Sequence, residues 1–198
     1  MYKFILVISI GVVLLSAGCS KPLETTSSPS FAEEEVESQN PTYTVPAEKS
    51  NEIDFSLLNS KYKFSANLPQ EFKAEYIPTS DSINIYNPDF SGNSSLEKSV
   101  IFIRNFKAND FLTLSTVNIL SSNKSSVQGR PAVQYEIKKK KDVPNFPNQP
   151  TWRNEQHKLI DIRYSSSNPS TFFVFSYNPN LPEPEFSSFV DSLEFIDE

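Results

Sequence analysis

Apolar and polar residues alternate along several short stretches between residues 61 and 106. In "YKFSANLP", Tyr62, Phe64 and Ala66 fall on one side of an extended chain, and the residues between them are polar. The same period of two runs through "EFKAEYIP" (71–78), "DSINIYN" (81–87) and "SVIFIRNF" (99–106). Because successive side chains of a strand point to opposite faces, this pattern predicts half-buried antiparallel strands.

Three further strands are predicted after residue 126. The stretch "VQGRPAVQYEIKKK" (127–140) turns at Gly129 and then places its apolar residues on one face. Two more strands, Lys158–Tyr164 and Thr171–Tyr177, are joined by a turn rich in serine, asparagine and proline. Residues 110–120 are ambiguous, because Asp110 suits a helix cap whereas the β-branched residues that follow favour a strand.

One helix is predicted near the end of the chain, in "PEPEFSSFVDSLEFI" (182–196). Phe186, Phe189, Val190 and Leu193 are spaced so that they form a single apolar stripe on a helix. Proline and glutamate at the start of this stretch suit a first helical turn.

Three of these stretches together resemble the PsbP-like family. They are the aromatic-alternating strand that ends in proline ("YKFSANLP"), the strand behind a glycine turn ("VQGRPAVQYE"), and the terminal helix that runs into a short strand ("FSSFVDSLEFI"). The resemblance implies an α+β domain with a central antiparallel sheet, flanking helices and a C-terminal amphipathic helix. It also implies a domain that binds or assists other proteins, but no functional residue of the family can be matched here.

The N-terminal residues predict export and lipid attachment. Lys3 precedes an apolar run from Phe4 to Leu15, which is shorter than the ~20 apolar residues that a membrane-spanning helix needs. The following "LSAGC" resembles the lipobox of bacterial lipoproteins, in which cleavage falls between Gly18 and Cys19 and the cysteine carries lipid. A thiolate is nucleophilic enough to accept that lipid, and two or more acyl chains hold a protein on a bilayer.

We therefore expect a cleaved signal peptide (1–18), a lipidated cysteine with a disordered tether (19–50), and a single domain (51–198). The tether is rich in serine, threonine, proline and glutamate, and it has too few large apolar residues to form a core. The expected location is the extracytoplasmic face of the cell membrane, or an outer membrane where the host has one.

The charge of the chain argues against nucleic acid as a partner. The chain has 18 basic and 24 acidic residues. Cleavage of the signal peptide removes Lys3, so the net charge of the mature protein is expected to be −7. Binding to the phosphate backbone needs a broad positive field, which such a chain lacks. The membrane, reached through acylated Cys19, and another envelope protein are the expected partners.

The residues that carry common catalytic chemistry are scarce. After cleavage only Gly92 and Gly129 remain, too few for a phosphate-cradling loop, and no cofactor is expected. His157 is the single histidine and is expected to be a surface or strand-edge residue, so neither a metal site nor a triad with Asp142 or Asp161 is predicted. We expect no enzymatic activity.

The segment "KKKKDVPNFPNQPTWRNEQHK" (138–158) contains the candidate partner contacts. They combine cations and aromatic rings: Lys138, Lys139, Lys140, Lys141, Phe146, Trp152 and Arg153. In the competing interpretation the lysines are a frayed strand end, and Phe146 and Trp152 fold back to cover a sheet edge. The chain as a whole is expected to be a non-catalytic binding or assembly module. An apolar-ligand or lipid carrier is the alternative, and a hydrolase is a weaker one.

Overall fold

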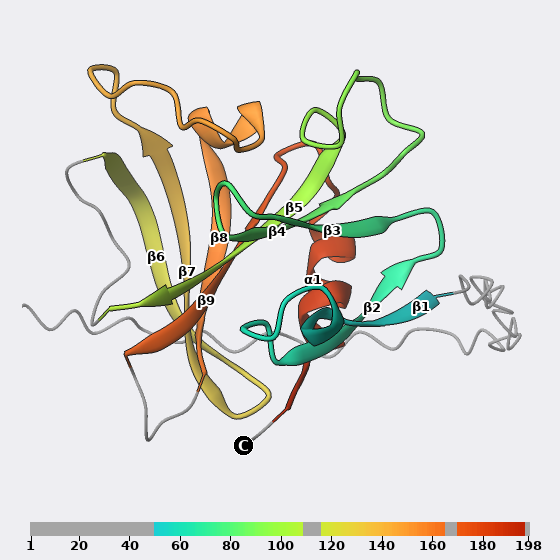
Figure 1. The fold of residues 1–198 in the computed structure, drawn as a ribbon. Coiled ribbons are helices and arrows are strands. Elements are labelled where there is room, and N and C mark those ends of the chain that lie inside the picture. Colours follow the sequence, from blue (N-terminus) through green and yellow to red (C-terminus); the bar gives the residue numbers. More distant parts are fainter. Residues whose placement is uncertain (1–49, 109–115, 165–169, 197–198) are drawn as a thin grey trace, which may run out of the picture. The chain divides into compact units, whose positions relative to one another are not determined.

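Antiparallel strands form the larger of two sheets in the computed structural model, which describes residues 50–108, 116–164 and 170–196. The larger sheet has seven strands in the order β3-β4-β5-β9-β8-β7-β6, so that β3 and β6 are its edges (Figure 1). The strands are β3 (Lys73–Ile77), β4 (Ser82–Tyr86), β5 (Ser99–Lys107), β6 (Val117–Val127), β7 (Arg130–Lys139), β8 (His157–Arg163) and β9 (Thr171–Tyr177). Every neighbouring pair is antiparallel.

A smaller sheet and one helix complete the architecture. The smaller sheet has three strands in the order β1-β2-β10. These strands are β1 (Ser50–Asp54), β2 (Phe64–Pro69) and β10 (Glu194–Phe195). The helix α1 spans Glu183–Asp191, and the 3-10 turns η1 and η2 span Phe55–Leu57 and Thr151–Asn154. Side chains of β2 and α1 belong to one buried cluster with side chains of β5 and β9, so the smaller sheet and α1 cover the same face of the larger sheet.

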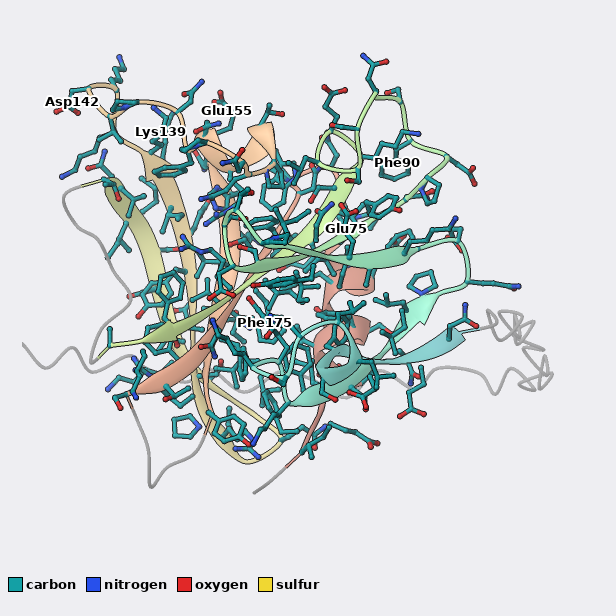
Figure 2. The ribbon with its side chains drawn as sticks, viewed as in Figure 1. Glu75, Phe90, Lys139, Asp142, Glu155 and Phe175 are labelled. Carbon is teal, nitrogen blue, oxygen red and sulfur yellow. The ribbon has the colours of Figure 1, made fainter. Side chains whose placement is uncertain are left out.

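Aromatic rings fill the space between the two sheets. The ring centroid of Phe64 on β2 lies 5.1 Å from that of Phe173 and 5.5 Å from that of Phe175, both on β9. Phe189 of α1 lies 6.0 Å from Phe175, which Figure 2 shows near the middle of the molecule. We call this side of the larger sheet the aromatic face. Burial of such rings is the main source of stability in a domain without disulfides, because each ring removes a large apolar area from water.

The helix and the glycine turn predicted from the sequence are confirmed. Phe186, Phe189 and Val190 are buried on one side of α1, as the spacing of the apolar stripe requires. The β6–β7 hairpin turns at Gln128 and Gly129, with φ angles of 49° and 73°. A two-residue turn with both φ angles positive matches the twist of the strands it joins, and glycine adopts this conformation without strain.

Two predictions about the fold need correction, and one open assignment is settled in part. The expected flanking helices are replaced by strands, since α1 is the one α-helix in the described residues, and the domain is mainly β. The strand at 99–106 was expected to be half-buried, but Ser99–Ile103 are buried on both faces because β5 lies in the middle of the sheet. The ambiguous stretch 110–120 is strand from Val117 onward, and residues 109–115 lie outside the described part.

The predicted signal peptide, Cys19 and the tether as far as residue 49 lie outside the described residues. All described residues belong to one unit, Val45–Glu198. Within 50–108, 116–164 and 170–196, no helix is long and apolar enough to cross a membrane.

Candidate functional site

A polar groove runs between α1 and the uncovered ends of β6, β7 and β8. It consists of two adjoining cavities of about 390 and 500 Å³, which share the lining residues Glu136, Lys158, Tyr177 and Glu183. These volumes fall in the range of small-ligand and peptide sites. We call this feature the α1 groove.

The floor of the α1 groove comes from the β6–β7 hairpin. Ser121, Asn123 and Ser125 of β6 line it at alternate positions, as a strand with one face toward the groove requires. Gln134 and Glu136 continue the floor on β7. The floor is therefore rich in hydroxyl, amide and carboxylate groups that can donate or accept hydrogen bonds.

The wall of the α1 groove is the helix itself. The rings of Phe186 and Tyr177 stack with centroids 4.0 Å apart, which fixes the start of the helix against β9. At the other end, the Ser192 hydroxyl accepts a hydrogen bond of 2.9 Å from the backbone N–H of Asn67 on β2. Gln128 of the hairpin turn donates a 3.1 Å hydrogen bond to the carbonyl of Asp191. The groove is thus bounded by elements that are held at both ends.

The lining of the α1 groove is acidic. Glu136, Glu183 and Asp191 line it against one cation, Lys158. The Lys158 ammonium lies 3.1 Å from both carboxylate oxygens of Glu183, and this hydrogen bond raises the pKa of Lys158. Because both partners are about half exposed or more, the ion pair adds little to the stability of the fold. With three carboxylates against one ammonium group, the lining of the groove keeps a net negative charge.

The structure separates the candidate contact residues of segment 138–158 into two groups. Lys138 and Lys141 are exposed, Lys139 and Lys140 are half-buried, and the Lys139 ammonium lies 2.5 Å from the Val143 carbonyl. Figure 2 shows Lys139 and Asp142 at the outer end of β7. The lysines therefore occupy the end of the sheet, and their contact with a partner stays a prediction.

The aromatic members of that segment turn toward the larger sheet. Phe146 packs against a second buried cluster, which contains Ile137 and Leu159. The Trp152 indole N–H donates a 3.1 Å hydrogen bond to the carbonyl of Ser99 on β5. We call this side of the larger sheet, opposite the aromatic face, the η2 face. The placement of both rings agrees with the interpretation in which this segment folds back onto the sheet.

Arg153 lies buried on the η2 face, and its contact with a partner stays a prediction. Its guanidinium carbon is 5.1 Å from the centroid of the Phe102 ring, and its Nη1 donates to Gln149 Oε1. The pKa of Arg153 is lowered to about 9, mainly by burial and also by the positive charge of Arg104. Its Nε has no hydrogen-bond partner in the described part of the chain.

His157 was expected at the surface or a strand edge, but it opens β8 with only 3% of its surface exposed. Its Nδ1 lies 3.0 Å from the carbonyl of Glu155, and its ring meets Trp152 edge-on with centroids 5.5 Å apart. The pKa of His157 is lowered to about 4, mainly by burial; the hydrogen bond to Glu155 opposes this shift, and the positive charge of Arg153 contributes to it. His157 is therefore neutral near pH 7.

The described residues give no support to triad or metal chemistry at His157. Asp161 is four positions further along the same strand, roughly 13 Å away at the rise of a β-strand. One oxygen of Asp161 accepts a 3.0 Å hydrogen bond from the backbone N–H of Val133 instead. Within the described ranges, no three His, Cys, Asp or Glu side chains gather in a way that could hold a metal ion.

Sequence reasoning missed the α1 groove because it missed β6. The run "SSNKSSV" (121–127) lacks the apolar alternation of a half-buried strand and is typical of a loop. The turn at Gln128–Gly129 could have indicated this strand. A two-residue glycine turn joins two paired strands, so the strand predicted after it implies a second strand of similar length before it.

Comparisons with known proteins find distant similarity to solved structures. No protein-family model and no curated protein matches the chain. The solution structure of cyanobacterial PsbP from Synechocystis sp. PCC 6803 is similar at 11% identity over 77% of this chain and 96% of that chain, with a TM-score of 0.42. The Ran-binding protein Mog1p of Saccharomyces cerevisiae is similar at 9% identity over 76% and 97%, with a TM-score of 0.43.

A protein from Bacteroides thetaiotaomicron is similar at 15% identity over 69% of this chain and 46% of that chain, with a TM-score of 0.28. At these identities and TM-scores, nothing about activity or partners follows.

Proposed function

We propose that this protein is a lipid-anchored, non-catalytic binding module of the cell envelope, attached through Cys19 and binding a partner protein in the α1 groove. The observation that supports a binding function is the α1 groove itself. It is a polar, charged cleft with rigidly held walls, large enough for a segment of polypeptide. The attachment rests on the lipobox-like "LSAGC" sequence.

The lining of the groove favours a polar partner over an apolar ligand. Ser121, Asn123 and Gln134 offer hydrogen bonds that an aliphatic ligand cannot use. The aromatic rings that suggested a lipid pocket from the sequence are packed against one another between the two sheets, with Phe64 and Phe175 fully buried. This arrangement weakens the carrier alternative.

Lipid attachment is tested by changing Cys19 to alanine. The unaltered protein should sediment with membranes and incorporate radiolabelled fatty acid. The Cys19→Ala protein should remain unlabelled and leave the membrane fraction. An unlabelled Cys19→Ala protein that stays in the membrane fraction would show that attachment does not depend on the lipid.

The binding site is tested by photo-crosslinking in living cells. A photoreactive amino acid replaces Ser187, an exposed residue of α1 that lines the groove, or Lys141 in the lysine run, or Glu71 in the turn after β2. We expect a defined adduct with an envelope protein from Ser187 and none from Glu71. Adducts from Lys141 alone would move the site to segment 138–158, and no adduct from any position would remove the support for a protein partner.

A further inference from the structure

The α1 groove opens beside the free edge of β6, and from this we infer what it binds. We propose that an extended segment of the partner, carrying lysine or arginine side chains, adds to β6 as an additional strand of the larger sheet. This inference rests on the proposed function, because it names the chemistry of the partner at the same groove.

The first argument is the hydrogen-bonding capacity of β6. Among the described residues β6 pairs with β7 alone, so the N–H and C=O groups of its other edge have no strand beside them there. Such an edge is a template for a further strand, and peptide-binding domains use it in this way.

The second argument is the length of this edge. β6 has 11 residues, whereas the opposite edge strand β3 has five and is followed at once by Pro78. Natural sheets protect their edges by short strands, prolines, bulges and charged side chains. β6 has one bulge, near Leu120, and one charged residue, Lys124, so the stretch from Ser121 to Val127 is weakly protected.

The third argument is the exposure of apolar residues at one end of β6. Ile119 and Leu120 are 36% and 50% exposed, and they are consecutive residues of the edge strand. A strand placed along β6 would cover them with its own side chains. The partner segment should therefore have apolar residues at the end that lies beside Ile119.

The fourth argument is charge. Glu136 lies opposite Ser121, Asp191 lies toward the turn of the hairpin, where its carbonyl accepts a hydrogen bond from Gln128, and Glu183 already pairs with Lys158. A lysine or arginine side chain is long enough to reach from an added strand across β6 to these carboxylates. An acidic segment would be repelled at the same place, which gives the groove its selectivity.

The test uses the full-length anchored protein in neutral detergent and synthetic peptides of about eight residues, which match the free part of β6. The first peptide alternates valine and lysine and carries a fluorescent label. The second has glutamate in place of lysine. The third keeps the lysines but is N-methylated at alternate residues, so that one edge of its backbone cannot donate hydrogen bonds. Binding is measured by fluorescence anisotropy.

Two protein variants with the same change in net charge provide the matched control. Asp191→Lys reverses a charge in the groove, at the end of α1 where a cation suits the helix dipole, and Glu71→Lys reverses one in an exposed turn elsewhere. We expect Asp191→Lys to weaken the binding of the lysine peptide by about fivefold, the effect of an exposed charge pair, and Glu71→Lys to leave it unchanged.

The lysine peptide should bind, and the glutamate and N-methylated peptides should bind at least about tenfold more weakly, since they lose charge attraction and strand pairing respectively. Equal binding of the N-methylated peptide would overturn strand addition. Equal binding of the glutamate peptide would overturn the charge argument.

A dimer of the protein that the lysine peptide dissociates would show that a second copy is the occupant of the edge, against our proposal. Failure of all three peptides, together with an adduct from Ser187 in cells, would overturn this inference while the proposed function stands.

Discussion

The two faces of the larger sheet are built from the same strands but bury different kinds of residue. On the aromatic face, Phe173 and Phe175 of β9 pack against rings of β2 and α1. On the η2 face, Ser176 of the same strand and His157 of β8 are buried with oxygen or nitrogen atoms that have no hydrogen-bond partner within the described ranges. Burial on the aromatic face therefore stabilises the fold directly, whereas burial on the η2 face also removes polar atoms from water, a cost in free energy that packing must offset.

The largest expected effect compares adjacent phenylalanines that point to opposite faces. Phe173→Ala should reduce the free energy of unfolding by about 4 kcal/mol, because rings from both sheets surround the cavity and cannot collapse into it. Phe172→Ala, on the η2 face, should cost at least about 1 kcal/mol less, since its neighbour Phe106 is only partly buried. Urea unfolding of both variants measures the difference, and equal losses would contradict the comparison.

The second effect is a pH dependence that comes from the η2 face. The pKa of His157 is about 4 in the folded protein against 6.5 ordinarily, so only the unfolded chain binds a proton between these values. Stability is therefore full above pH 6.5 and should fall by about 3 kcal/mol as the pH drops to 4. Urea unfolding at pH 7, 5.5 and 4 should show a smaller loss for His157→Gln. The same loss in both proteins would mean that His157 is not the group that titrates.

The third effect compares two arginines on the η2 face. Arg163 lies 3.8 Å from the fully buried carboxylate of Asp161, whereas Arg153 has no carboxylate within ion-pair distance in the described residues. Arg163→Met should cost about 2 kcal/mol, because it removes a cation from a buried anion. Arg153→Met should cost less than about 1 kcal/mol, because it also relieves the burial of a charge. A larger loss for Arg153→Met in thermal or urea unfolding would reverse this account of the η2 face.

The smallest effect lies at the surface, beside the β3–β4 turn. Lys61 Nζ is 2.6 Å from Asp81, and this hydrogen bond, with a second one from Tyr76, lowers the pKa of the carboxyl group. In Lys61→Met the pKa of Asp81 should rise toward its ordinary range, with little change in stability because both groups are half exposed. An NMR titration of the Asp81 carboxyl measures it, and an unchanged pKa would show that Lys61 has no influence on it.

Much of the aromatic face could be predicted from the sequence. Alternation in "YKFSANLP" and the stripe of Phe186, Phe189 and Val190 identify residues that the structure buries there. Local periodicity is sufficient where one side of an element faces a core and the other faces water.

The η2 face and the α1 groove could not be predicted in the same way. His157 and Arg153 are polar residues whose burial depends on how the segment after β7 folds back, which no local pattern encodes. β6 is polar from Ser121 to Ser126 and is a strand there because β7 lies beside it. Pairing between strands, more than intrinsic propensity, decides such cases.

The most direct test of the central claim, that a partner binds in the α1 groove, combines the crosslinking and the charge reversal. The yield of the adduct from the photoreactive residue at position 187 is measured in living cells for Asp191→Lys and for Glu71→Lys. We expect the yield to fall about fivefold in Asp191→Lys, because the groove loses its attraction for a cationic segment, and to stay unchanged in Glu71→Lys. Equal yields from the two variants would contradict the account.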